Sequence, residues 1–518
     1  MKNKFFIAVV ACACLGTLTS CESWLDEEVR SSMTSQDYYK TASQIQENAT
    51  ALYRRGAPNQ LTGAGSAYMG PVSMYPGMLT GYFINERTCQ YARELTRQQQ
   101  TNTVGGNFES LYYYCYQAIN IANGIIKYAP DVTMSDDARN VALGEAYFFR
   151  AFNYFTLVKY FGVPLVTTPS EDISKLQTPK SAAADVYAQI ESDLKQATDL
   201  LPAKKFYENG NKVGKYVAAM LLTSVYMQEG KYSEAANSVK TVLNSGHALT
   251  ANENLTDKSA YNILRSTDGL DEVIYAYEYN ASISTSGWWP SYSFANADGL
   301  LSTYSICRRV YGPTKRFLNI YEANDLRVQP NQFFHWNFSY VNKDGVTKTW
   351  SSPDAGCWYF YDEDACMTTG QGTKDQNFFR YSEALLDAAE AIVQAGGAVT
   401  DEAAGYLAQV QVRANGKTLE ATKTALKALS KDDFIHACWT ERLREFPLEF
   451  KIWDDCLRTG MFPSVSETTK GKVDFVKLVG ATNGSGATFK ATDLVWPFPL
   501  TELQRNGKLE QNEGYAKE

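Results

Sequence analysis

The stretch 143–167, LGEAYFFRAFNYFTLVKYFGVPLVT, decides the fold of this chain. Its aromatic residues lie nearly all round a helix, which predicts that other helices cover it on most sides. Ser135 is the expected N-cap, with acidic residues in the first turn. Gly162 is expected to take a left-handed cap conformation, and Pro164 prevents the helix from continuing. The pattern indicates a long core helix of a helical scaffold rather than a binding site.

Composition excludes several classes of function. The 518 residues carry a net charge of −8, which disfavours binding to phosphate backbones, so we expect no nucleic-acid partner. The three histidines lie far apart in the sequence, and the chain contains neither a phosphate-binding loop nor a protease or hydrolase motif. We therefore expect no metal, no cofactor and no catalytic residues. The unusual feature is an aromatic content of 13%, with 34 Tyr and 9 Trp.

The N-terminus predicts export and a lipid anchor. Lys2 and Lys4 precede a short apolar segment over 5–18, which ends at Leu-Thr-Ser-Cys over 18–21. This ending looks like a bacterial lipoprotein cleavage box, so we expect a signal peptide over 1–20, lipidation of Cys21 and a tether over 21–34. Acyl chains on Cys21 would anchor the protein to outer-membrane lipid. The alternative is an ordinary signal peptide followed by a chance cysteine.

Seven cysteines follow Cys21, at positions 89, 115, 307, 357, 366, 438 and 456. An odd number leaves at least one thiol free within a single chain. Cys357 and Cys366 are a possible pair in an exported loop, and the sequence alone does not decide whether they form a disulfide.

Helical periodicity fills most of the chain. It predicts helices over 35–55, 108–128, 135–161, 183–200, 216–228, 232–243, 377–394, 401–413 and 431–446. The pair 216–228 and 232–243 resembles a tetratricopeptide hairpin, because small residues allow the two helices to approach closely. The expected fold is mainly α, a tetratricopeptide-like scaffold of about four helix pairs.

Two segments interrupt the helices, 56–105 and about 247–372. The second holds five of the nine tryptophans and short alternating runs over 272–279 and 333–341 that predict small strands. Asn342 to Gly345 predicts a tight turn between two strands. The scaffold is therefore expected to carry an irregular, loop-rich half with a few short strands.

Four blocks of sequence resemble the SusD/RagB family of outer-membrane nutrient-binding lipoproteins. They are RAFNYF with YFGVPL over 150–165, FRYSEALL with AAEA over 379–391, ER-REF with Glu449, WD and RTG over 441–460, and FPLTELQRNGKLEQNEGY over 498–515. The order of the blocks and the cleavage box at Cys21 match the family. Lys451 and Ser382 depart from the family pattern, at positions that we expect to belong to the helical scaffold.

The resemblance implies a single unit over 35–518. Its helical scaffold would cover about 35–55, 106–245 and 375–460, its ligand-binding part about 56–105 and 247–372, and its C-terminal tail about 461–518. It also implies a non-catalytic, surface-exposed protein that captures an oligosaccharide or polysaccharide and delivers it to a SusC-like TonB-dependent transporter. The alternative is a tetratricopeptide scaffold of the envelope that binds protein or peptide.

Aromatic residues in the irregular segments are the candidate glycan-binding residues. Sugar rings stack their apolar faces on flat side chains and bond polar groups at their edges. Trp288, Trp289 and Tyr292 lie in a Ser- and Pro-containing loop, and Trp336 and Trp358 follow in the same segment. The resemblance adds Tyr82, Tyr91 and Arg93 from the 56–105 segment. Replacing Trp288 and Trp289 together with Ala is expected to abolish binding with little change in the melting temperature.

Carboxylates offer two weaker alternatives. The acidic run 362–364 is more typical of a solvated face than of a glycosidase pair. Asp344 and the same run lack the spacing of a calcium loop. The sequence does not name the glycan or its linkage.

Overall fold

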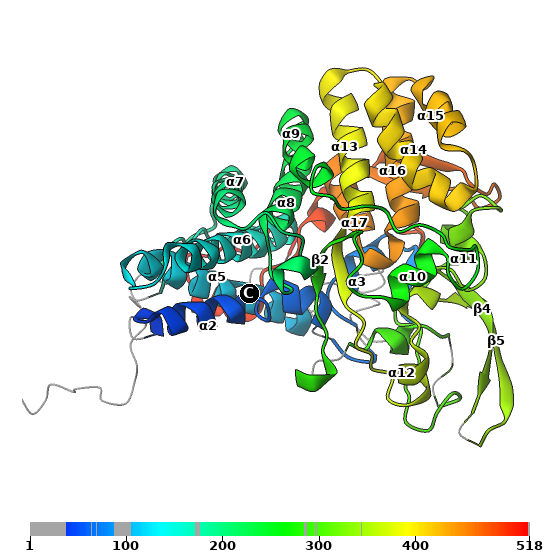
Figure 1. Cartoon of the computed structure of the whole chain (residues 1–518), viewed down its shortest axis with the longest axis horizontal. Coiled ribbons are helices and arrows are strands. Elements are labelled where there is room, and N and C mark those ends of the chain that lie inside the picture. The colour runs from blue at the N-terminus through cyan, green and yellow to red at the C-terminus, as the bar shows by residue number, and fades with distance from the viewer. Residues whose placement is uncertain are drawn as a thin grey trace, which may run out of the picture.

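The computed structural model describes residues 38–63, 65–68, 70–86, 105–170, 177–283, 287–295, 297, 299–342 and 344–515. Figure 1 shows helices stacked side by side across the molecule, with the irregular segments and a long hairpin at the lower right. The helices are α2 Ala42–Leu52, α3 Met74–Leu79, α5 Gly105–Tyr128, α6 Asp136–Tyr160, α7 Ala183–Leu200, α8 Lys215–Gln228, α9 Tyr232–Leu243, α10 Ala260–Ser266, α11 Lys315–Leu318, α12 Glu363–Met367, α13 Tyr381–Gly396, α14 Asp401–Asn415, α15 Leu419–Lys427, α16 Lys431–Glu445, α17 Ile452–Thr459 and α18 Leu500–Arg505.

The strands form separate two-stranded antiparallel sheets in the described chain. They are β1 Phe83–Ile84 with β3 Gly312–Pro313, β2 Val273–Tyr277 with β6 Gln376–Arg380, β4 His335–Val341 with β5 Thr347–Gly356, and β7 Met461–Val465 with β8 Val473–Lys477. The predicted turn between β4 and β5 is present, because the Asn342 side chain accepts from the backbone N–H groups of Asp344 and Val346. Figure 1 shows that this hairpin projects from the body of the molecule.

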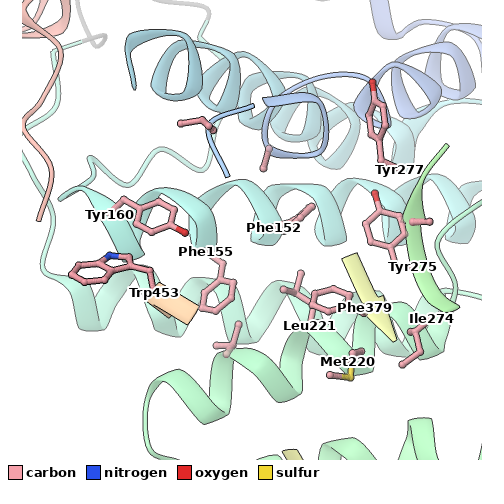
Figure 2. Packing of buried hydrophobic residues seen from close by; sticks show 14 of the residues in the cluster. Phe152, Phe155, Tyr160, Met220, Leu221, Ile274, Tyr275, Tyr277, Phe379 and Trp453 are labelled. Carbon is pink, nitrogen blue, oxygen red and sulfur yellow. The ribbon is translucent and has the colours of Figure 1, made fainter. Parts of the chain in front are cut away.

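Helix α6 is the core element that the sequence predicts. The Ser135 hydroxyl accepts a hydrogen bond from the Ala138 N–H at 3.3 Å, as an N-cap does. Helices α2, α5, α7 and α8 all contact α6. Phe148, Phe152 and Phe155 are buried along it. Figure 2 shows Phe152 and Phe155 facing side chains of α8 and of the β2–β6 pair.

The predicted role of Gly162 is wrong. Phe161, the C-cap residue after α6, has φ −120° and ψ 175°, an extended conformation, and Gly162 is not among the residues with positive φ. A Cβ at position 162 would instead overlap the Lys180 side chain. The glycine therefore permits close approach of Lys180 rather than a left-handed cap.

Helices pack against one another in a series, which confirms the mainly α, tetratricopeptide-like fold. Contacts join α5 to α6, α6 to α7, α7 to α8, α8 to α9, α9 to α13 and α13 to α14. The predicted helix over 183–200 coincides with α7, and the hairpin of α8 and α9 begins and ends within a residue of its prediction. Helix α2 begins later than expected, because Thr41 and Gln44 form a capping box.

Residues 377–380 are a strand, so the prediction that they begin a helix is wrong. Strand β6 pairs with β2, with Ala276 opposite Asn377 and Tyr277 opposite Gln376. The Tyr275 ring lies parallel to that of Phe378, with centroids 5.2 Å apart. This pairing holds the irregular half against the α6 core, since the Phe152 ring lies 5.3 Å from the same Phe378 ring.

Two networks of buried ion pairs contain charged residues of the FRYSEALL and ER-REF blocks, namely Arg380, Glu383, Arg442 and Glu445. In the first, the Arg380 guanidinium lies 2.6 Å from Glu272, 3.0 Å from Glu445 and 2.8 Å from Glu449. Arg413 bridges Glu272 and Glu445 as well. In the second, Arg442 and Arg458 lie among the carboxylates of Glu383, Asp387, Glu390 and Asp455. The first network joins Glu272, directly before β2, and Arg380 of β6 to α14 and α16, so these blocks connect the two halves of the molecule.

The possible disulfide between Cys357 and Cys366 is not formed in the structure. Cys115, Cys307, Cys357, Cys366, Cys438 and Cys456 are all free and buried. The Cys357 Sγ donates to the Tyr311 carbonyl at 3.0 Å, whereas the Cys366 Sγ lies against the Pro290 carbonyl. Cys357 and Cys366 therefore contact different elements and form no disulfide with each other.

Candidate functional site

A cavity of about 300 Å³ lies in the irregular half, where several separate segments of chain meet. This volume is at the lower end of small-molecule binding sites. Helix α10 and the residues after it form one side, and the strand β6 with the residues before it forms another. The 3-10 turns Trp289–Tyr292 and Trp358–Phe360 and the start of α12 complete the lining. Figure 1 shows α10 and α12 in the lower right part of the molecule.

Aromatic rings form one wall of this cavity. Trp289, Tyr359, Phe360 and Tyr361 all contribute to the lining. The Trp289 indole N–H donates to the Tyr279 hydroxyl at 3.2 Å, and its ring lies 5.3 Å from that of Phe360. These contacts fix the rings in place before any ligand arrives, which reduces the entropy lost on binding.

Polar groups also line this cavity. The Asp375 carboxylate accepts from the Tyr207 hydroxyl at 3.0 Å and from the Tyr279 N–H at 2.9 Å. Gln376 and Asn377 follow it on β6. The Oδ1 atom of Asn377 is buried and has no hydrogen-bond partner in the structure. A buried acceptor without a partner is energetically costly.

Local structure sets these side chains at the cavity. An isolated bridge between Gly287 and Gly372 brings the Trp289 turn against the segment before β6, with hydrogen bonds of 2.9 and 3.0 Å in both directions. Asp362 caps α12 by accepting from the Ala365 N–H at 2.9 Å. A Cβ on Gly372 would crowd both the Asp362 carboxylate and the Pro290 ring, so a glycine fits there.

The structure brings only part of the predicted aromatic set to this cavity. Trp289 lies in its wall. Trp358 is buried and outside the lining, stacked on Tyr361 with ring centroids 4.1 Å apart. Trp288 and Trp336 are half-buried and outside the lining, so their contact with a glycan stays a prediction.

Two predicted ligand contacts require correction. Tyr82 is fully buried, its ring stacks on Phe462, and its hydroxyl donates to the Pro463 carbonyl at 2.6 Å. Tyr292 is 1% exposed and donates to the Ser66 carbonyl at 2.7 Å. Neither ring presents a face to a ligand. Tyr91, Arg93 and Cys21 lie outside the described residues.

Several cavity residues are absent from the sequence-based candidates, namely Arg265, Asp268, Asp375, Gln376 and Asn377. Their side chains are ordinary polar types scattered over more than a hundred positions. Only the pairing of β2 with β6 brings them together, so the sequence carries no local signal for them.

The described residues also lack two features that would indicate other functions. No group of three or more His, Cys, Asp or Glu side chains is placed to hold a metal ion in this part of the chain. No helix within the described ranges is both long and apolar enough to cross a membrane.

Comparison with known proteins agrees with the resemblance. The SusD family profile matches residues 202–515, and a second profile, described as starch-binding associating with outer membrane, matches residues 23–227. SusD-like protein P2 from Formosa agariphila is 27% identical over 444 residues, which cover 79% of this chain and 81% of the relative.

Solved structures show the same fold. A SusD superfamily protein from Parabacteroides distasonis aligns with a TM-score of 0.78 at 21% identity, over 93% of this chain and 100% of that chain. Surface glycan-binding protein A from Bacteroides uniformis aligns with a TM-score of 0.67 at 20% identity, over 91% of this chain and 99% of that chain. The first family profile spans more than half of the sequence, and this chain therefore belongs to the SusD/RagB family.

Proposed function

We propose that this chain binds carbohydrate at the cell surface, in the cavity beside Trp289. The observation that carries the proposal is the lining itself, which combines packed aromatic rings with the polar side chains of Asp375, Gln376 and Asn377. This is the combination that sugar rings require, since their faces are apolar and their edges carry hydroxyl groups. Proteins of the SusD family bind carbohydrate without catalysis, so the chain is a binding protein and not an enzyme.

We further propose that the protein is anchored through lipidated Cys21 and passes its glycan to a SusC-like TonB-dependent transporter. The cleavage box over 18–21 supports the anchor. The second family profile, with its description of outer-membrane association, supports the location. Mass spectrometry of the protein purified from membranes tests the anchor, because an acylated Cys21 must be the first residue. Co-purification of a TonB-dependent barrel with the full chain tests the partner.

Blocking the cavity tests the binding site. Thr373 is exposed and lines the cavity, so Thr373→Trp fills the space without removing a core contact. Thr369 is also exposed but lies outside the lining, which makes Thr369→Trp a matched control. We expect the full chain and the control to bind a common oligosaccharide on a glycan array, and Thr373→Trp to lose that binding. Equal binding by both variants would place the site elsewhere. Binding of peptides but of no glycan would support the envelope scaffold instead.

A further inference from the structure

The cavity beside Trp289 carries an uneven set of charges. Its described lining includes the carboxylates of Asp268, Asp362, Glu363 and Asp375, but only two cationic side chains, Arg265 and Lys374. Because the cavity is small, each of these charges lies close to any ligand inside it. Whether a charged side chain can bind a ligand depends on whether it is already paired within the protein.

Both cations are already engaged by the protein. The Lys374 Nζ lies 2.7 Å from the Asp268 carboxylate and donates to the Asp375 carbonyl at 3.0 Å. The Arg265 guanidinium donates to the Tyr361 carbonyl at 2.9 Å and to the Asn262 side chain at 2.8 Å. It also lies over the rings of Trp358 and Tyr361. An anionic ligand would have to compete with these partners.

Asp375 is different, because no ion pair to its carboxylate occurs within the described ranges. Its two oxygens accept from the Tyr207 hydroxyl and the Tyr279 N–H, which leaves each oxygen able to accept another hydrogen bond. Burial and then the nearby Asp268 carboxylate raise the pKa of Asp375 to about 6. The group therefore remains mostly ionised at neutral pH.

We infer that this cavity selects glycans by charge, taking neutral or amino sugar units and excluding units that carry carboxylate or sulfate, with Asp375 as the specificity-determining residue. The inference rests on the proposed function, that this cavity holds the glycan. Hydroxyl and ammonium groups are donors that satisfy the free acceptor capacity of the Asp375 carboxylate, which lines the cavity. A carboxylate or sulfate offers only acceptors and adds like-charge repulsion.

Binding of length-matched oligosaccharides by the full chain tests this selection. The probes are neutral gluco- and manno-oligosaccharides, chitosan oligosaccharides and oligogalacturonates, measured by calorimetry at low salt. We expect a neutral or amino probe to bind roughly tenfold or more tightly than the galacturonate, because like charges repel strongly in a partly buried site. We expect Asp375→Asn to reduce this ratio several-fold. Asn keeps the shape of Asp and can accept one of the two existing hydrogen bonds.

Asp474→Asn is the matched control, because Asp474 is exposed on β8 and the substitution changes the net charge equally. In this control, the ratio of the affinity for the neutral or amino probe to the affinity for the galacturonate must stay unchanged. Oligogalacturonate that binds best to the wild type, and is lost in Lys374→Gln, would overturn the charge selection while leaving the proposed glycan-binding function intact. Absence of binding to every probe and to a full glycan array would overturn the proposed function and this inference with it.

Discussion

Trp288 and Trp289 are neighbours in sequence but lie in different surroundings. Trp289 is 6% exposed, with its ring against those of Phe360 and Phe450 and its N–H bonded to Tyr279. Trp288 is half-buried. The expectation that both can be removed with little loss of stability is therefore revised, since it treats the two rings as equally exposed.

Single substitutions are expected to separate the two residues. Trp289→Ala removes a ring from a packed site and should lower the free energy of unfolding by about 3–5 kcal/mol. Trp288→Ala should cost about 1 kcal/mol, a common value for a point substitution. Urea denaturation of each variant measures both values. Equal losses would show that the two rings are packed to the same degree.

Glu272 is expected to give the protein an acid-sensitive contribution to stability. Burial alone would raise its pKa, but the Arg413 and Arg380 guanidinium groups lower it to about 2, against an ordinary value of 4.5. A folded-state pKa below the unfolded value stabilises the protein above about pH 4.5, and this contribution is lost as the pH falls toward 2. The shift corresponds to on the order of 3 kcal/mol.

The difference between wild type and Glu272→Gln isolates this group from other titrations. Asp387 has the opposite shift, because burial raises its pKa, and it titrates equally in both proteins. We expect the difference in unfolding free energy to be largest above pH 4.5 and smallest near pH 2. A difference that stays constant with pH would mean that Glu272 is not held ionised by its arginines.

At the scale of elements, the sequence predicts the scaffold well and the β2–β6 pair poorly. Helices such as α7 are encoded in local periodicity and end where Pro202 follows. Residues 377–380 continue the apolar pattern of α13, so they read as helix, but pairing with β2 from a hundred positions away overrides that pattern. The candidate site depends on the same pairing. The residue type therefore predicts Trp289 as a site residue, but nothing in the sequence predicts Asp375 or Asn377.

Arg380, at the end of β6, is expected to be the residue on which this pairing most depends. Arg380→Met would leave the carboxylates of Glu272, Glu445 and Glu449 buried with fewer partners. Removing one partner from a buried ion pair costs about 3–5 kcal/mol. Lys258→Met is the control, because it removes a cation from the exposed pair with Glu253 and should cost under about 1 kcal/mol. Urea midpoints that shift equally would mean that the buried network contributes no more than a surface pair.

At the scale of the whole molecule, the described scaffold and irregular segments share one core. Phe148 and Phe152 of α6 contact Tyr275 of β2, and Trp496 near the C-terminus stacks on Tyr160 with ring centroids 4.4 Å apart. Buried ion pairs cross between the same parts. These contacts favour a single folding unit over 35–518, which is what the family resemblance implies.

A single unit predicts one cooperative unfolding transition. Pulsed hydrogen exchange with mass spectrometry follows peptides from α13 and from the β4–β5 hairpin in the same denaturation series. Because the β2–β6 pair bonds both to α13 and to the irregular half, we expect both peptides to become labelled at the same denaturant midpoint. A hairpin that becomes labelled well before α13 would show that the irregular half unfolds separately, as a local unit of lower stability. In Arg380→Met, where the buried link is weakened, the two midpoints are expected to move apart. This separation would assign the coupling between the halves to the ion network rather than to the shared aromatic core.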